Sequence, residues 1–494
     1  MNPHGTAEPR QRRFSSLETI DLIFLALIVL AFALRLYYFI LTKDQPLWWD
    51  EAEYMLKAKA LAFGTPATGW YRRRPVLLPF LAAGLFTVGI GETAIRLLWI
   101  ALSTATLCFV YGIGARLFNK RIGLYAVALA AAFYLDLFYS MRLLVDVPQV
   151  FFVALAAFLF VRAVYYERSA YGAWAIVPII VLGTAMRFTV LLFFVVAALF
   201  LIVIKRGHAI RDKRWLISLG LGAVGYLPFL IYYWAQYENP FFPFLSQRAL
   251  RTSTSVGPSP SDVLLDYIRF FPNYTNAVVT LVFLAAVALA IATIVRQLDR
   301  AQGYFFLILW TIVPFLFFSL CVDHFEDRYL AMIFPAVFLL TAAALDVAGQ
   351  YLKRFNPAAA TAAITVILVY AAGSMAAHSH AVITARINSF AAVRDAGLWI
   401  KEQSRPDDTV VTSSVPQNTY YAERASYSFP KQPGDFDRLL ADRRPKFLVL
   451  SIWEGSPKWA YDWPERHPEI AEVAVAFFLD QAQKRPAAIV YSLR

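Results

Sequence analysis

The stretch that decides the fold is Leu22–Leu41, LIFLALIVLAFALRLYYFIL, and the motif WWDEAEY follows it at Trp48–Tyr54. An apolar run of about 20 residues is long enough to cross the hydrocarbon core of a bilayer as an α-helix. The motif places two adjacent carboxylates, Asp50 and Glu51, among aromatic rings where the chain re-enters water. They are either solvated anchors beside interfacial Trp and Tyr residues or a catalytic pair that faces a lipid-borne substrate.

The composition of the whole chain is typical of a polytopic α-helical membrane protein. Of its 494 residues, 59% are hydrophobic and 16% are charged, whereas about 25% of the residues in a soluble protein are charged. The formal charge of +12 lies mostly between the apolar runs, so we expect no nucleic-acid partner. The two cysteines, Cys108 and Cys321, lie inside apolar runs, and we interpret them as buried side chains without a disulfide.

About eleven segments are candidate transmembrane helices. If the N-terminus is cytoplasmic, every inner loop is basic, as the positive-inside rule requires, and an odd number of spans places the C-terminus outside. We therefore expect a protein of the cytoplasmic (inner) membrane with an extracytoplasmic C-terminal region. The candidate spans are residues 22–41, 94–117, 122–139, 147–165, 172–186, 188–204, 215–235, 277–295, 304–321, 329–347 and 358–378.

These patterns divide the chain into three parts. We interpret residues 1–16 as a cytoplasmic tail and residues 17–379 as a transmembrane catalytic domain. The apolar runs stop near residue 380, and helix-like and strand-like stretches then alternate, so residues 380–494 are predicted to form a small extracytoplasmic α/β domain. The first outer loop, residues 42–93, is far longer than a connection needs to be and is expected to be functional.

The outer loops contain three predicted local features. Residues 51–62 are expected to form a short helix, and residues 75–88 an apolar, proline-containing segment in the membrane interface. Residues 252–261 are rich in Ser, Thr, Gly and Pro, so we expect a mobile piece that acts as a lid over a site.

Charged residues gather in the same outer loops. Asp50, Glu51 and Asp146 are the candidate catalytic carboxylates, because a carboxylate near the interface can take a proton from an attacking hydroxyl or amine. Arginines can hold a phosphate and stabilise it as it leaves. Together these groups favour transfer from a membrane-anchored phosphate. The candidate substrate-binding residues are Tyr54, Tyr71, Arg72, Arg74, Arg187, His324, Glu326, Arg328 and Tyr329.

Structural interpretations of several of these side chains stay open. Arg72–Arg74, like Arg35 in the first span, fit side chains that extend toward the interface. Asp146 could pair with Arg142 one helical turn away. No phosphate-binding glycine loop or zinc-ligand spacing occurs, so the sequence requires no cofactor, and it leaves a divalent metal open.

In their order along the chain, these residues resemble the GT-C glycosyltransferases that use polyprenyl-phosphate sugars, in particular the protein O-mannosyltransferase and aminoarabinose-transferase-like group (glycosyltransferase families 39 and 83). The likeness extends over residues 22–345 and loosely into the C-terminal region. The matching features are the pair Asp50-Glu51, Tyr54 in the same short helix, Arg74-Pro75, Asp146, Arg187, and the charged run Glu326 to Leu330.

The resemblance implies an integral-membrane glycosyltransferase whose active site lies outside the cytoplasm. Asp50 is the implied general base of an inverting transfer, and Glu51 and Asp146 orient the acceptor or the sugar. Arg74, with Arg187, Arg328 and Tyr329, binds the departing polyprenyl phosphate, which is undecaprenyl or dolichyl phosphate. The acceptor is an extracytoplasmic glycolipid, glycan or protein.

The sugar is left open, and a second function competes with transfer. Glu53 and Arg73 stand where the aminoarabinose transferases have residues of opposite charge. The alternative function is a transporter or flippase of lipid-linked sugars, although such proteins usually contain internal repeats and none is evident here. A non-catalytic lipid-binding subunit is a third interpretation.

Overall fold

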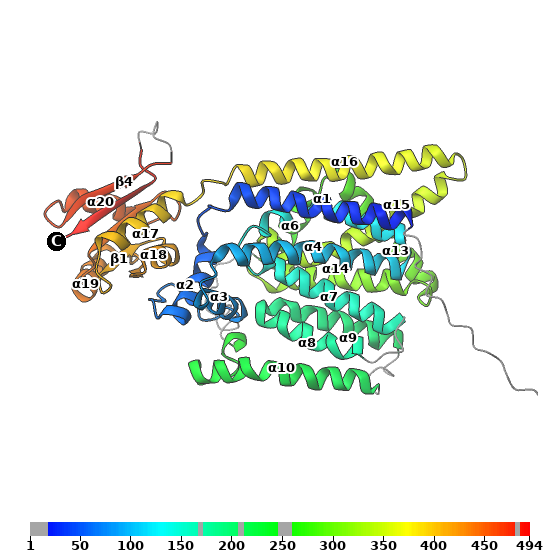
Figure 1. Cartoon of the computed structure of the whole chain (residues 1–494), viewed down its shortest axis with the longest axis horizontal. Coiled ribbons are helices and arrows are strands. Elements are labelled where there is room, and N and C mark those ends of the chain that lie inside the picture. Colours follow the sequence, from blue (N-terminus) through cyan, green and yellow to red (C-terminus); the bar gives the residue numbers. More distant parts are fainter. Residues whose placement is uncertain (1–17, 166–170, 206–211, 246–258, 480–484) are drawn as a thin grey trace, which may run out of the picture.

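The computed structural model describes residues 18–165, 171–205, 212–245, 259–479 and 485–494. A helical bundle forms most of the molecule, and a smaller part with a β-sheet lies at one end of it (Figure 1). The predicted tail, residues 1–16, lies outside the described residues, as does most of the predicted lid, residues 252–258.

Eight helical segments of the described chain are long and apolar enough to cross a membrane. The chain is therefore an integral membrane protein, while the number of eleven spans stays a prediction. The eight segments are α1 (Thr19–Thr42), α4 (Glu92–Leu117), α7 (Asp146–Tyr165), α10 (Lys213–Tyr237), α13 (Ala277–Gln297), α14 (Gln302–Cys321), Asp327–Leu352, which contains η3 (Asp327–Ile333) and α15 (Phe334–Leu352), and α16 (Pro357–Thr384).

Shorter helices complete the bundle. Among them, α8 and α9 are apolar and correspond to the two predicted segments 172–186 and 188–204. The short helix η1 lies between them. They are α8 (Tyr171–Met186), η1 (Phe188–Val190), α9 (Leu191–Lys205) and α12 (Pro260–Tyr274).

The predicted single span at residues 122–139 is wrong. The chain forms two helices there, α5 (Lys120–Ala130) and α6 (Tyr134–Tyr139). The break between them frees backbone carbonyls, and the Ala132 carbonyl accepts a hydrogen bond from the Ser379 hydroxyl of α16 at 3.1 Å. A partner on a distant helix therefore compensates the lost helical hydrogen bond.

Arg35 does not extend to the membrane interface, which corrects the snorkelling interpretation. Its side chain is fully buried, and its guanidinium forms an ion pair with Asp136 of α6 and donates to the Ser103 hydroxyl. Asp136 also accepts a hydrogen bond from Ser103. An intramembrane charge is costly unless it is paired, and this pair satisfies that requirement.

The first outer loop contains two helices that pack on each other, α2 (Trp49–Phe63) and α3 (Leu77–Thr87). The first agrees with the short helix predicted over residues 51–62. At its start, the Glu51 carboxylate accepts the Trp48 backbone N–H at 2.9 Å, which satisfies an otherwise unpaired donor. It ends at Gly64, whose φ of +71° is a left-handed conformation that glycine adopts at little cost.

The C-terminal part contains a five-stranded sheet in the order β2-β1-β3-β5-β4, with β2, β1 and β3 parallel and the rest antiparallel. Its place outside the cytoplasm and its boundary at residue 380 stay predictions, since α16 continues to Thr384. The strands are β1 (Thr409–Thr412), β2 (Ala425–Tyr427), β3 (Phe447–Ser451), β4 (Ala471–Phe477) and β5 (Ala488–Leu493), and the helices are α17 (Ala391–Gln403), α18 (Val415–Ala422), α19 (Pro433–Arg443) and α20 (Lys458–Arg466).

Two apolar cores bear on the site. The larger core fills the helical bundle, and a second lies beneath α2 and α3, where it also includes Tyr420 of α18. The expectation that the cysteines are buried is wrong, because Cys108 and Cys321 are free thiols on exposed faces of their helices. A lipid-facing surface is apolar like a core, so composition alone does not separate the two.

Candidate functional site

Asp50 is the centre of a cluster of charged side chains between the first outer loop and η3. Its two carboxylate oxygens accept from different arginines: Oδ1 from Arg74 Nη2 at 2.6 Å and Oδ2 from Arg328 Nη2 at 2.7 Å. The three side chains are only about one-fifth exposed, at 19%, 22% and 17%. Residues that are 24 and 278 positions from Asp50 in the sequence thus meet at one carboxylate.

Glu53 completes the side of the cluster formed by the first loop. Its carboxylate forms an ion pair with Arg74 through one oxygen and accepts the Trp49 indole N–H at 2.8 Å through the other. The Arg74 guanidinium also lies over the ring of Tyr54, 5.2 Å from its centroid. Arg74 is thereby held by two carboxylates and an aromatic face.

Asp146 and Arg187 extend the cluster toward the bundle. Asp146 begins α7 and is 1% exposed, and it forms an ion pair with Arg187, which precedes η1. Its second oxygen lies 3.9 Å from Arg328 Nη1 and accepts no hydrogen bond. Glu326 binds Arg328 Nε at 2.5 Å. The predicted pairing of Asp146 with Arg142 is therefore wrong.

Glu51 does not share the cluster with Asp50. Its side chain is fully buried, and besides the Trp48 N–H it accepts the Leu143 N–H at 2.7 Å and contacts Arg142 Nη1 at 3.4 Å. Burial lowers the pKa of Arg142 to about 10, although the Glu51 charge opposes this shift. Glu51 thus links the start of α2 to the chain before α7. This structural role differs from the direct contact with acceptor or sugar that the resemblance implies.

The other candidate residues lie at the rim of the cluster. His324 is about half exposed and lies between Asp323 and the Tyr329 hydroxyl, at 2.8 and 2.9 Å. Tyr329 also lies beneath the Arg187 guanidinium, 5.3 Å from its carbon to the ring centroid. Tyr71 and Arg72 are exposed, and neither has a contact with Asp50 among the interactions of the described residues.

The charges of the cluster set the protonation of its carboxylates. Burial alone would raise the pKa of Asp50, but the guanidinium groups of Arg74 and Arg328 outweigh it and hold that pKa below its ordinary value. Burial raises the pKa of Glu53 despite the opposing charge of Arg74. Asp50 is therefore an anion at neutral pH, and in this arrangement it is a weak base.

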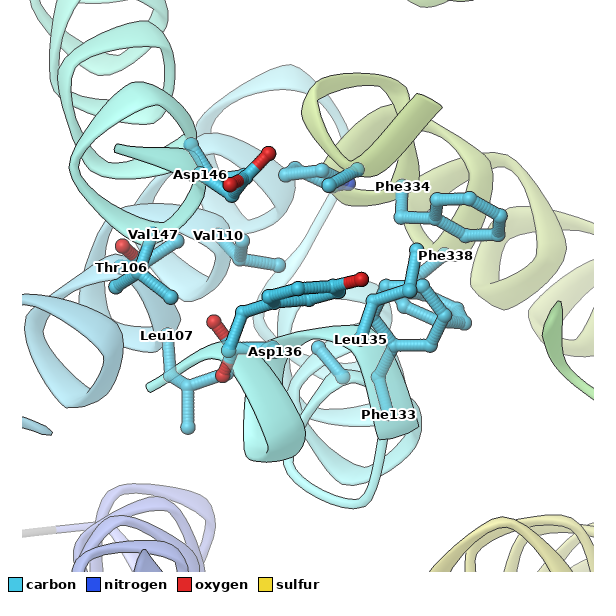
Figure 2. Close-up of a pocket in the computed structure, with 15 residues that line it drawn as sticks. Thr106, Leu107, Val110, Phe133, Leu135, Asp136, Asp146, Val147, Phe334 and Phe338 are labelled. Atoms are coloured by element: carbon cyan, nitrogen blue, oxygen red, sulfur yellow. The ribbon is translucent and has the colours of Figure 1, made fainter. Parts of the chain in front are cut away.

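An apolar pocket adjoins the cluster inside the bundle. It lies among α4, α6, α7 and α15, and Figure 2 shows Asp146 on one side of it and Asp136 on the opposite side. The rings of Phe334 and Phe338 line a further side. The lining is mostly apolar, and the carboxylates of Asp136 and Asp146 are its charged members.

Sequence reasoning missed a second group of residues that holds η3 in place. Asp327 accepts hydrogen bonds from the Tyr134 and Tyr139 hydroxyls at 2.9 and 3.3 Å, and its carbonyl accepts from Tyr274 at 3.0 Å. Asp327 directly precedes Arg328, so these tyrosines fix the backbone that carries a cluster arginine. No sequence signal marks them, because tyrosine is frequent in apolar segments and its partner lies far along the chain.

Among the described residues, no group of three or more His, Cys, Asp or Glu side chains is arranged to hold a metal ion. The carboxylates of the cluster are paired with guanidinium groups instead.

Comparisons with known proteins confirm the resemblance that the sequence indicates. Residues 73–233 match the family described as dolichyl-phosphate-mannose-protein mannosyltransferase. No curated protein sequence matches the chain. The family description names a dolichyl-phosphate sugar, and two of the similar solved structures contain a polyprenyl phosphate.

The similar solved structures share the fold at low sequence identity. ArnT from Cupriavidus metallidurans, bound to undecaprenyl phosphate, has a TM-score of 0.70 and 14% identity over 95% of this chain and 97% of its own. The oligosaccharyltransferase AglB from Archaeoglobus fulgidus, in complex with an inhibitory peptide and a dolichol-phosphate, has a TM-score of 0.62 and 12% identity over 87% of this chain and 69% of its own. The arabinofuranosyltransferase AftD from mycobacteria has a TM-score of 0.56 and 13% identity over 97% and 40%.

Proposed function

We propose that the protein is a glycosyltransferase that moves a sugar from a polyprenyl-phosphate donor to an acceptor outside the cytoplasm. The observation that carries this proposal is the position of the Asp50 carboxylate between the guanidinium groups of Arg74 and Arg328. A base and two phosphate-binding cations are thereby brought together, and an apolar pocket lies beside them. The fold shared with ArnT and AglB, each solved with a polyprenyl phosphate, supports the same donor class.

In the proposed reaction, Asp50 takes the proton of the acceptor hydroxyl or amine. The acceptor atom then forms a bond to the anomeric carbon of the sugar, and the bond from that carbon to the phosphate oxygen breaks. The electron pair of this bond leaves with the polyprenyl phosphate, and attack from the opposite face inverts the configuration. Arg74, Arg187 and Arg328 stabilise the negative charge of the leaving phosphate.

Donor binding also activates the base in this proposal. Without donor, Asp50 neutralises Arg74 and Arg328, which lowers its own basicity. A phosphate that takes over these guanidinium groups brings a negative charge beside Asp50, and both effects raise the Asp50 pKa. The carboxylate therefore becomes a stronger base only when the sugar donor is bound. At that point it can deprotonate the acceptor that attacks this sugar.

The remaining candidates have supporting roles in this proposal. Asp146 positions Arg187, and Glu51 positions α2 rather than contacting the acceptor. The rings of Tyr54 and Tyr329 pack against the guanidinium groups of Arg74 and Arg187. Glu326 is a further partner of Arg328. We assign contacts with the sugar or the acceptor to the exposed Tyr71, Arg72 and His324.

The N-terminus is proposed to be cytoplasmic, with the cluster and the C-terminal sheet outside. This assignment rests on the basic inner loops of the sequence. The acceptor is a glycolipid, a glycan or a protein, and the family match makes mannose the first sugar to test.

Transfer is tested by following the sugar itself. Proteoliposomes with wild-type protein or Asp50→Asn are supplied with undecaprenyl-phosphate-linked mannose and with other lipid-linked sugars, together with extracted acceptor glycolipids. A covalent sugar–acceptor product from the wild type only is the expected result. Movement of intact lipid-linked sugar across the bilayer without any product would favour the flippase instead.

A further inference from the structure

Helix α18 of the C-terminal part contacts two segments of the first outer loop that lead to residues of the cluster. It packs on α2, which carries Asp50 and Glu53, and on the chain segment Thr68–Gly69, which precedes Arg74. In Figure 1, α18 lies beside α2 at the junction between the sheet and the bundle.

The contacts with α2 fix the start and the middle of that helix. The Leu47 N–H, three residues before Asp50, donates to the Tyr421 hydroxyl at 2.7 Å. Lys59 of α2 forms an ion pair with Glu423 at 2.9 Å and lies over the Tyr420 ring, 4.1 Å from its centroid. The backbone N–H of Leu47 would be left without this partner if the tyrosine hydroxyl were removed.

The contacts with the segment before Arg74 are separate from these. The Thr68 hydroxyl lies 3.0 Å from the Thr419 hydroxyl and also accepts the Ser426 N–H at 3.0 Å. Gly69 has a φ of +94°, and a Cβ there would lie 3.1 Å from Val415 Cγ1. This close approach and left-handed backbone favour glycine and press the segment against α18.

The other end of α18 is anchored in the sheet. Gln417 is fully buried and donates to Glu454 Oε1 at 2.9 Å, and the Ser414 hydroxyl donates to the second oxygen of the same carboxylate. Glu454 follows β3, so its two bonds tie α18 to the loop at the end of that strand. A helix that is held at both ends can fix the distance between the two segments that it contacts, besides covering their surface.

We infer that α18 is a brace that sets the position of Asp50 relative to Arg74, with Tyr421 and Thr419 as positioning residues. The inference rests on the proposed function for the meaning of that spacing. Tyr421 holds the chain that leads into Asp50, and Thr419 holds the chain that leads into Arg74. A phosphate competes with Asp50 for Arg74. Loosening the first contact and loosening the second are therefore expected to change the affinity for that phosphate in opposite directions.

The test measures the affinity of the purified full-length protein for undecaprenyl phosphate by titration. Tyr421→Phe removes the hydrogen bond that holds the chain before Asp50. The Asp50 carboxylate then competes less well with a phosphate for Arg74, so binding is expected to become about threefold tighter. Thr419→Val removes the hydrogen bond to Thr68 that holds the chain before Arg74. Arg74 is then held less firmly for the phosphate, and binding is expected to weaken about threefold. Tyr461→Phe is the matched control, because the Tyr461 hydroxyl also accepts a backbone N–H, from Ser456 at 3.0 Å, without contact to α2.

The sign of the change separates a brace from a purely stabilising helix. If Tyr421→Phe and Thr419→Val shift the affinity in the same direction, or no more than Tyr461→Phe does, the brace is refuted. Should Tyr421→Phe fail to fold, Lys59→Gln loosens the same side through a partly exposed ion pair and is expected to tighten binding. A wild-type protein that binds no undecaprenyl phosphate would instead overturn the proposed function.

Discussion

Asp50→Asn is expected to separate binding of the lipid phosphate from transfer of the sugar. The asparagine keeps the shape of the aspartate and removes its charge. Because the carboxylate pairs with Arg74 at 2.6 Å and Arg328 at 2.7 Å, a phosphate must displace it to use both guanidinium groups. The substitution removes this competitor, so the variant is expected to bind undecaprenyl phosphate more tightly than the wild type does.

The size of the effect follows from the two interactions. A hydrogen bond to a charged group contributes about 1.5–3 kcal/mol, and the amide still accepts weaker bonds from the arginines. A net gain of about 1.5 kcal/mol corresponds to about tenfold tighter binding. Transfer is expected to fall by about 10²- to 10⁴-fold, because the general base is lost.

The assay is a titration with undecaprenyl phosphate beside a transfer measurement on the same preparations. Asp44→Asn is the matched control, since Asp44 is an exposed carboxylate of the same loop and forms an ion pair with Lys43 at 2.6 Å. The reasoning is refuted if Asp50→Asn binds the lipid no more tightly than Asp44→Asn does. It is equally refuted if Asp50→Asn retains wild-type transfer.

Three further predictions concern stability and pH. Glu51→Gln is expected to destabilise the fold by about 3 kcal/mol, because it leaves the buried Arg142 without its counter-charge, and thermal unfolding in detergent measures the loss. Arg35→Met is expected to destabilise by a similar amount, because Asp136 then keeps a charge inside the bundle without a cation, whereas the double variant Arg35→Met/Asp136→Asn recovers much of the loss. For pH, the Asp50 pKa is lowered in the free protein, so kcat/KM falls only when acid protonates Asp50 below the ordinary aspartate range near about 4. The acid limb of kcat is expected at higher pH, because bound phosphate raises that pKa, and coincident limbs would contradict donor-dependent activation.

The sequence predicts the members of the cluster better than it predicts their geometry. Asp50, Arg74 and Arg328 are all expected from the charged outer loops, and the structure brings them together. Glu51 is different, because consecutive residues of a helix point about 100° apart. The side chains of Asp50 and Glu51 therefore leave α2 in different directions, and packing decides that Asp50 is the one in the cluster.

Glu53 could have been found from its spacing. It lies three residues after Asp50, and residues at that spacing share a face when both belong to one helix, as they do in α2. Arg35 also carried a usable signal, because a charge inside a span requires a partner in the bundle. The break between α5 and α6 carried none, since residues 131–133 contain neither glycine nor proline and their freed carbonyl finds its partner on α16.

The central claim is that Arg74 helps to hold the phosphate of a polyprenyl lipid, and mass spectrometry of co-purifying lipids tests it most directly. The wild type, Arg74→Ala and Arg73→Ala are purified from the same membranes, since Arg73 has the same charge but contacts Tyr71 at 3.4 Å instead of Asp50. We predict a polyprenyl phosphate or its glycoside with the wild type and Arg73→Ala, and its loss from Arg74→Ala. The same polyprenyl lipid in all three preparations, or only bulk phospholipid in each, would contradict the account.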